Sequence, residues 1–208
     1  MKKQTITIII IAVIILAVII GAILIINNKS KGNEEGKIET AEQMKEMFKT
    51  IYSKLGEKLP NLETQEISIE DETQVKAYTG LKSNKDIEKI VVSEPLMSSQ
   101  AYSAVAVKVK SGANVEKMKQ EMLDNIDMAK WICVSASNLY ITNSGNTIFM
   151  VMADEDLAKP VYEAYKEYVN NKIGKELEKV SEDGDIELLE ELAYKVKDGA
   201  MCGLGQTA

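Results

Sequence analysis

The sequence predicts an α+β protein in which an N-terminal transmembrane helix is followed by an antiparallel sheet with helices packed on one face. Two observations support this class. Residues 6–26 form an uncharged run that contains twelve isoleucines. After it, segments with helical spacing of apolar residues alternate with strand-like segments, an order that suits a sheet covered by helices. The chain divides into a cytoplasmic tail (1–5), the transmembrane anchor (6–26), a linker (27–38) and the α+β extracytoplasmic domain (39–172). The last part (173–208) is a charged segment with a C-terminal amphipathic helix and a Gly-rich tail.

The first element is the apolar run 6–26. At about 1.5 Å per helical residue it spans roughly 31 Å, the thickness of a bilayer core. A cleaved signal peptide is shorter and ends in a small-residue cleavage site, and a lipoprotein needs a Cys directly after the run, whereas the first Cys is Cys133. We therefore expect a permanent anchor with a cytoplasmic N-terminus, and a cell-membrane protein whose main domain is extracytoplasmic and whose first partner is the lipid bilayer.

The first helix of the domain is well defined by its ends. Thr40 and Gln43 have the spacing of a capping box, apolar residues follow at helical spacing, and Gly56 ends the run. The next stretch predicts short strands, at Ile67–Ile69, Val75–Tyr78 and Ile87–Val92.

The second half of the domain alternates strands and helices. A strand at Ala101–Lys110 precedes a helix capped by Asn114. Two strand-like runs follow, at Trp131–Ala136 and Leu139–Thr142. The turn Asn143–Asn146 then makes a hairpin with the strand Thr147–Met152, Asp154 caps a helix, and residues from Ile186 to Val196 predict a last amphipathic helix.

The charged residues exclude several kinds of chemistry. The chain has no His, and all 25 of its basic residues are Lys. Without His there is no usual general base near neutral pH and no imidazole ligand for zinc. The chain after residue 31 has a net charge of about −11, which disfavours contact with phosphate backbones. We therefore predict no catalysis, no cofactor, no metal and no nucleic-acid partner.

The two cysteines are Cys133 and Cys202. An extracytoplasmic setting permits a disulfide between them, but Cys133 lies in the apolar run Trp131–Val134, so we expect a buried free thiol there.

A weak ligand-binding candidate is the loop between two predicted strands that carries Ser98, Ser99 and Gln100. The alternative interpretation is an ordinary turn. A hydrolase that uses Ser98 or Ser99 with a Lys base is physically possible, but no Ser-x-x-Lys spacing supports it. The acidic runs Glu70–Glu72 and Asp154–Asp156 lack the pattern of a dedicated Ca²⁺ loop.

Several segments resemble the family known as domain of unknown function 4358, which comprises membrane-anchored proteins of Gram-positive anaerobes. The matching pieces are Ser98–Ser99, Val105–Lys110, Glu116–Leu123 and Ala129–Ala153. The resemblance implies the location and the architecture, and it implies no activity.

The C-terminal tail resembles another family. Asp185–Leu192 followed by Met201–Ala208 is similar to the iron–sulfur segment of the NADH-binding (flavin) subunit of NADH dehydrogenases and NAD-linked hydrogenases. That resemblance implies an electron-transfer fragment or fusion in which Cys202 is one ligand of a [4Fe–4S] cluster. The cluster needs four ligands, and the Cys-x-x-Cys-x-x-Cys run that would supply the other three is absent. The leading prediction is therefore a membrane-anchored extracytoplasmic binding or accessory module with an unidentified protein or small-molecule partner.

Overall fold

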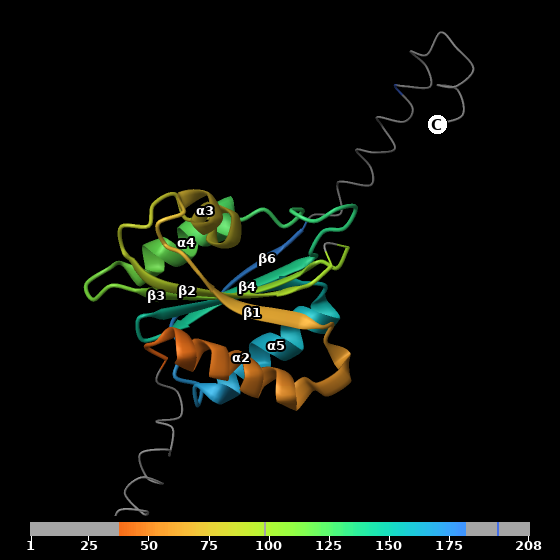
Figure 1. Ribbon diagram of the computed structural model, residues 1–208, viewed down its shortest axis with the longest axis horizontal. Coiled ribbons are helices and arrows are strands. Elements are labelled where there is room, and N and C mark those ends of the chain that lie inside the picture. The colour runs from red at the N-terminus through yellow and green to blue at the C-terminus, as the bar shows by residue number, and fades with distance from the viewer. Residues whose placement is uncertain (1–37, 98, 182–194, 196–208) are drawn as a thin grey trace, which may run out of the picture.

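The computed structural model describes residues 38–97, 99–181 and 195 (Figure 1). The predicted anchor, Ser98, Cys202 and nearly all of the predicted C-terminal helix lie outside the described residues. Among the residues that are described, no helix is both long and apolar enough to cross a membrane.

The domain is built on one six-stranded sheet in which every pair of neighbouring strands is antiparallel. The strands are β1 (Leu62–Ile67), β2 (Ile87–Pro95), β3 (Tyr102–Val109), β4 (Asn138–Ser144), β5 (Thr147–Ala153) and β6 (Leu177–Val180). Their spatial order is β1-β2-β3-β5-β4-β6. The predicted α+β class with an antiparallel sheet is confirmed.

Helices cover both faces of this sheet, so the prediction that they pack on one face is wrong. Helices α2 (Ala41–Leu55) and α5 (Glu155–Tyr168) pack on one face, and α3 (Glu72–Thr79) and α4 (Val115–Asn125) lie on the other (Figure 1). The physical reason is the composition of the central strands. Every residue of β5 is buried, and along β3 Ala104 and Ala106 face α2 and α5 while Val105 and Val107 face α3 and α4. A strand that is apolar on both faces needs a cover on both.

Several predicted element ends are confirmed. The Gln43 amide N–H donates to Thr40 Oγ1 at 3.2 Å and the Thr40 N–H donates to Gln43 Oε1 at 3.1 Å, which completes the capping box of α2. Gly56, with φ +59°, ends α2. Asn114 Oδ1 accepts from the Lys117 N–H at 3.0 Å at the start of α4. The predicted hairpin joins β4 to β5 with Ser144 opposite Thr147.

Two predicted strands are wrong. Val75–Tyr78 lies in helix α3, because Asp71 Oδ1 accepts hydrogen bonds from two amides of the first turn and Gly80, with φ +73°, ends the helix. Trp131–Ala136 makes no strand but an irregular loop in which Cys133 has φ +61°. The expected burial of Cys133 is also wrong, because its thiol is exposed. Sequence reasoning missed β6, because two of its four residues are charged and the segment lacks an apolar strand pattern.

The sheet has two distinct ends. We name one of them the loop end: β2, β5 and β6 end there, and β3 and β4 begin there. At this end Asn138, the first residue of β4, lies opposite both Ala153 and Val180. At the opposite end, the hairpin end, Thr147 Oγ1 donates to the carbonyl of Ile38. The described domain therefore begins at the hairpin end, and its last strand finishes at the loop end.

Candidate functional site

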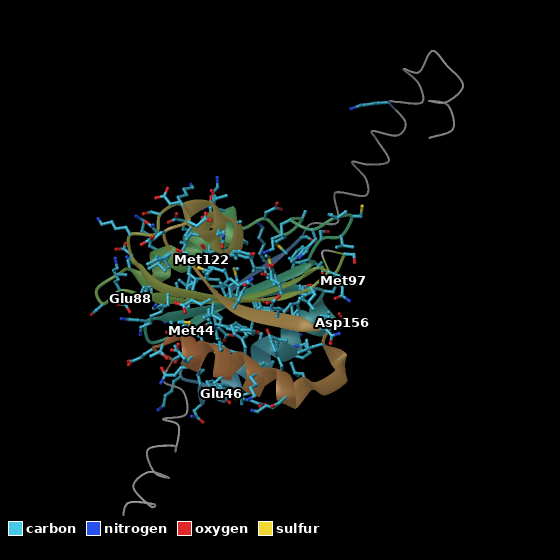
Figure 2. All side chains as sticks on the ribbon, in the orientation of Figure 1. Met44, Glu46, Glu88, Met97, Met122 and Asp156 are labelled. Atoms are coloured by element: carbon cyan, nitrogen blue, oxygen red, sulfur yellow. The ribbon has the colours of Figure 1, made fainter. Side chains whose placement is uncertain are left out.

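Exposed apolar side chains concentrate at the loop end. Among the described residues, the large apolar side chains that are exposed are Leu96, Met97, Ile132, Val134 and Val180. We name these five residues the loop-end apolar group. The first two follow β2, the next two lie in the loop before β4, and Val180 is paired with the first residue of β4. Figure 2 shows Met97 at this end and Glu88 at the other. Exposed apolar side chains that gather in one region of a soluble domain commonly mark an interaction surface.

A cavity of about 680 Å³ opens beside this group. Four separate segments line it, and they contribute Lys58–Pro60, Ser99–Tyr102, Cys133–Ser135, and Asp154 with Leu157. The loop-end position of each segment follows from the sheet, since each one begins or ends next to a strand terminus. The cavity thus brings together loops that are far apart in the sequence, which is the usual construction of a binding site on a rigid sheet.

Two of the three predicted ligand-binding residues line this cavity. Ser99 and Gln100 are exposed on its wall, and the Gln100 carbonyl accepts a hydrogen bond from the Tyr102 N–H at 3.0 Å. Ser98 lies outside the described residues. Sequence reasoning missed the apolar neighbours Leu96 and Met97, although two apolar residues between Pro95 and a serine pair, inside a turn, were a usable signal.

One lining residue of the cavity, Tyr102, is fully buried and is bonded to helix α2 through its hydroxyl. The Tyr102 hydroxyl donates to the Tyr52 hydroxyl at 3.0 Å, which joins β3 to helix α2. Burial raises the pKa of both phenols above the ordinary value near 10. Both phenols therefore stay neutral well above physiological pH, and their hydrogen bond ties β3 to α2.

A lysine fixes the loop before β4. Lys130 forms an ion pair with Glu94 of β2, and its amine lies 4.9 Å from the centre of the Tyr78 ring and 5.3 Å from that of Trp131. Burial and the Glu94 carboxylate raise the pKa of Tyr78. The loop before β4 is therefore held against β2 and α3 by charge and cation–π contacts.

This lysine also bears on the serine hydrolase alternative. The Lys130 amine lies 3.3 Å from Ser103 Oγ, but Ser103 is fully buried and the amine is paired with a carboxylate. A buried hydroxyl cannot reach a substrate, so this pair supports the loop rather than a nucleophilic reaction.

Two further clusters are structural. Tyr165 of α5 stacks on Phe149 with ring centres 4.0 Å apart, and its buried hydroxyl has no hydrogen-bond partner among the described residues. The Tyr162 hydroxyl donates to Glu176 Oε2 at 2.8 Å. Burial raises the pKa of both phenols, and at Tyr162 the Glu176 carboxylate adds to the increase.

The described residues contain no group of three or more side chains suited to hold a metal. Asp71 in the first acidic run caps α3, and the second run stands at the start of α5, where negative charge stabilises a helix. Cys202, the residue implied as a cluster ligand, lies outside the described residues.

No protein-family model, no curated protein and no solved structure matches this chain. The two family resemblances therefore stay predictions.

Proposed function

We propose that the protein is a single-pass, membrane-anchored module that binds a protein partner outside the cytoplasm through its loop end, with no catalysis of its own. Residues 6–26 supply the anchor, and the described domain begins at Ile38, which contacts the hairpin end. The loop end lies at the other side of the sheet. Strands of up to nine residues separate the two ends, which at about 3.3 Å per residue is roughly 30 Å.

The observation that carries the proposal is the position of the loop-end apolar group. Leu96 is 71% exposed and Ile132 is 67% exposed, while most apolar side chains of the strands are buried on the two covered faces of the sheet. A surface that faces away from the attachment point is open to a partner that approaches from outside. A lipid surface fits less well than a protein partner, because the chain enters the domain at the opposite end.

The contacts available set the strength of the complex. Full burial of a large apolar side chain contributes about 1.5–3 kcal/mol, so the group offers on the order of 10 kcal/mol. Association costs about 4–15 kcal/mol before any surplus appears. We therefore expect a weak or transient complex in which Ser99 and Gln100 add hydrogen bonds at the rim. The acidic exterior and the absence of His support a binding role over phosphate recognition or acid–base catalysis.

The test is site-specific photo-crosslinking in intact cells that produce the full chain. A benzophenone amino acid replaces Met97 in one variant and Glu46, on the outer face of α2 (Figure 2), in the matched control. We expect a discrete crosslinked protein from position 97 alone, and we expect Ile132→Asp to abolish it while leaving the domain folded. Protease added to intact cells should digest the domain. Equal crosslinking from both positions, or a protected domain, would overturn the proposal.

A further inference from the structure

Two charged side chains on the wall of the loop-end cavity have no ion-pair partner among the described residues. Lys58 ends the short 3-10 helix η1 (Gly56–Lys58), which follows α2, and Asp154 is the N-cap of α5. The Asp154 side chain makes no capping hydrogen bond, and both side chains are exposed. They line the same cavity but do not pair with each other. We name Lys58 and Asp154 the two cavity charges.

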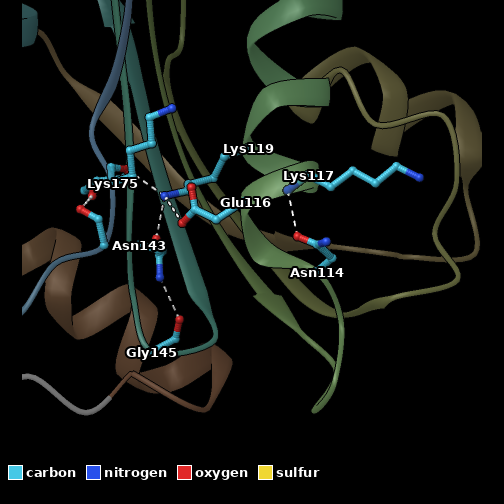
Figure 3. A network of polar contacts seen from close by, with 9 residues as sticks. Asn114, Glu116, Lys117, Lys119, Asn143, Gly145 and Lys175 are labelled. Atoms are coloured by element: carbon cyan, nitrogen blue, oxygen red, sulfur yellow. Dashed lines mark hydrogen bonds and ion pairs between the residues drawn. The ribbon is translucent and has the colours of Figure 1, made fainter.

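The buried lysine of helix α4 shows the contrast. The Lys119 amine contacts Glu116 Oε1, Asn143 Oδ1 and the Lys175 carbonyl (Figure 3). The protein itself satisfies that charge, so its role is to hold β6 against α4. The two cavity charges have no such partners in the part of the chain that the structure describes, so both can contact a bound molecule.

Part of the cavity wall is apolar and is fixed by the core. Leu59 and Leu157 line the cavity and also pack against the buried cluster between the sheet and helices α2 and α5. Tyr102 lines it as well, and its hydroxyl is bonded to that of Tyr52. The volume of about 680 Å³ falls in the range of small-molecule sites, which combine apolar walls with a few polar groups.

Opposite charges on one cavity wall select against ligands that carry a single charge. Lys58 attracts an anion while Asp154 repels it, and the reverse holds for a cation. A zwitterion can place its carboxylate at the lysine and its ammonium at the aspartate, which gives two charge-assisted hydrogen bonds. Ser99 and Gln100 on the same wall supply further donors and acceptors.

We propose that the cavity binds a zwitterionic small molecule, namely an α-amino acid or a short peptide with an apolar side chain. Lys58 contacts the carboxylate, Asp154 contacts the ammonium group, and the apolar side chain lies against Leu59 and Leu157. The amino acid and the short peptide share this chemistry and differ in the separation of their two charges. The inference goes beyond the proposed function, because a small ligand can occupy the cavity whether or not a protein partner binds the loop-end apolar group.

The test measures binding to the full-length chain in lipid nanodiscs by equilibrium dialysis. The probes are leucine and leucyl-leucine. The comparison compounds are 4-methylpentanoate, which lacks the ammonium group of leucine, and 3-methylbutylamine, which lacks its carboxylate. We expect at least one of the two zwitterions to bind about 10-fold more tightly than either comparison compound, since each charge-assisted contact is worth about that factor. Comparison of leucine with leucyl-leucine then shows which charge separation the cavity fits.

Two variants assign the charges. Lys58→Gln should remove the preference for the zwitterion over the amine, and Asp154→Asn should remove the preference over the carboxylic acid. Both residues are exposed, and Asn is as good an N-cap as Asp, so the fold should be kept. The matched controls are Lys54→Gln and Asp156→Asn, at exposed residues near the two cavity charges but outside the cavity wall. These controls should leave every affinity within about 2-fold of the starting protein.

The thiol of Cys133 locates the bound ligand. It is exposed and lines the cavity, and in a Cys202→Ser background it is the only thiol of the chain. A saturating zwitterion should slow its alkylation by N-ethylmaleimide by about 3-fold or more, because the ligand restricts access to the thiol. The inference is overturned if neither zwitterion binds, if a comparison compound binds equally well, if the control variants lose binding as the test variants do, or if binding leaves the alkylation rate unchanged.

Discussion

Replacing Lys119 by methionine should destabilise the protein and release β6 first. The Lys119 side chain is fully buried, and its amine contacts Glu116 Oε1 at 2.8 Å, Asn143 Oδ1 at 2.7 Å and the Lys175 carbonyl at 2.6 Å. Methionine replaces the apolar part of the side chain, but it leaves the two neutral acceptors without this donor. An unsatisfied buried acceptor costs about 1–3 kcal/mol. The Glu116 side chain is 55% exposed and regains water, so we expect a total loss of about 3 kcal/mol in the free energy of unfolding.

The assay is urea unfolding of the full-length chain in detergent, followed by circular dichroism and by Trp131 emission. Lys117→Met is the matched control, because Lys117 lies on the same helix with an exposed side chain and should change the free energy by less than about 0.5 kcal/mol. Hydrogen exchange at the amides of Leu177–Val180 should accelerate in Lys119→Met before the rest of the sheet does. A loss below about 1 kcal/mol with unchanged exchange would refute the assignment of Lys119 as the tie between α4 and β6.

Three further predictions follow from single contacts. Tyr165→Phe should leave the free energy of unfolding unchanged or raise it by up to about 1 kcal/mol, because the Tyr165 hydroxyl has no partner among the described residues. Tyr162→Phe should lower it by about 1–2 kcal/mol, because it removes the hydrogen bond to Glu176; the reverse order in urea melts would contradict this. Gly80→Ala should cost at least about 2 kcal/mol more than Gly112→Ala, because both glycines have positive φ but a Cβ at Gly80 would lie 2.8 Å from the Ile126 nitrogen. Stability should fall above about pH 10, because the four buried phenols with raised pKa values stay protonated when folded and ionise when unfolded; a flat urea midpoint from pH 10 to about pH 11.5 would refute this.

The sequence predicted elements best where local signals decide the structure. The capping box at Thr40, the cap at Asn114 and the hairpin before Thr147 depend on neighbouring residues, and all three are confirmed. The helix at Val75 was missed because its cap, Asp71, lies before a short segment with weak periodicity. The second helical layer was missed because it depends on the burial of both faces of β5, which is a property of the whole sheet.

The candidate site was only partly predictable. The loop with Ser99 and Gln100 follows from the position of two strands, and the structure places both residues in the cavity. The role of Ile132 and Val134 could not be predicted, because the same apolar run fits a buried strand by composition. The positive φ of Cys133 and the contacts of Lys130 turn this run outward, and both features depend on the tertiary structure.

The packing of α2 against α5 has a consequence for biosynthesis. Met44, Met47 and Phe48 of α2 join a core that α5 completes, yet α2 ends at Leu55 and α5 begins only at Glu155. At translation rates of about 5–20 residues per second, the apolar side of the first helix waits roughly 5–20 s for its cover. During that interval the nascent chain exposes an apolar surface to which a holding chaperone can bind.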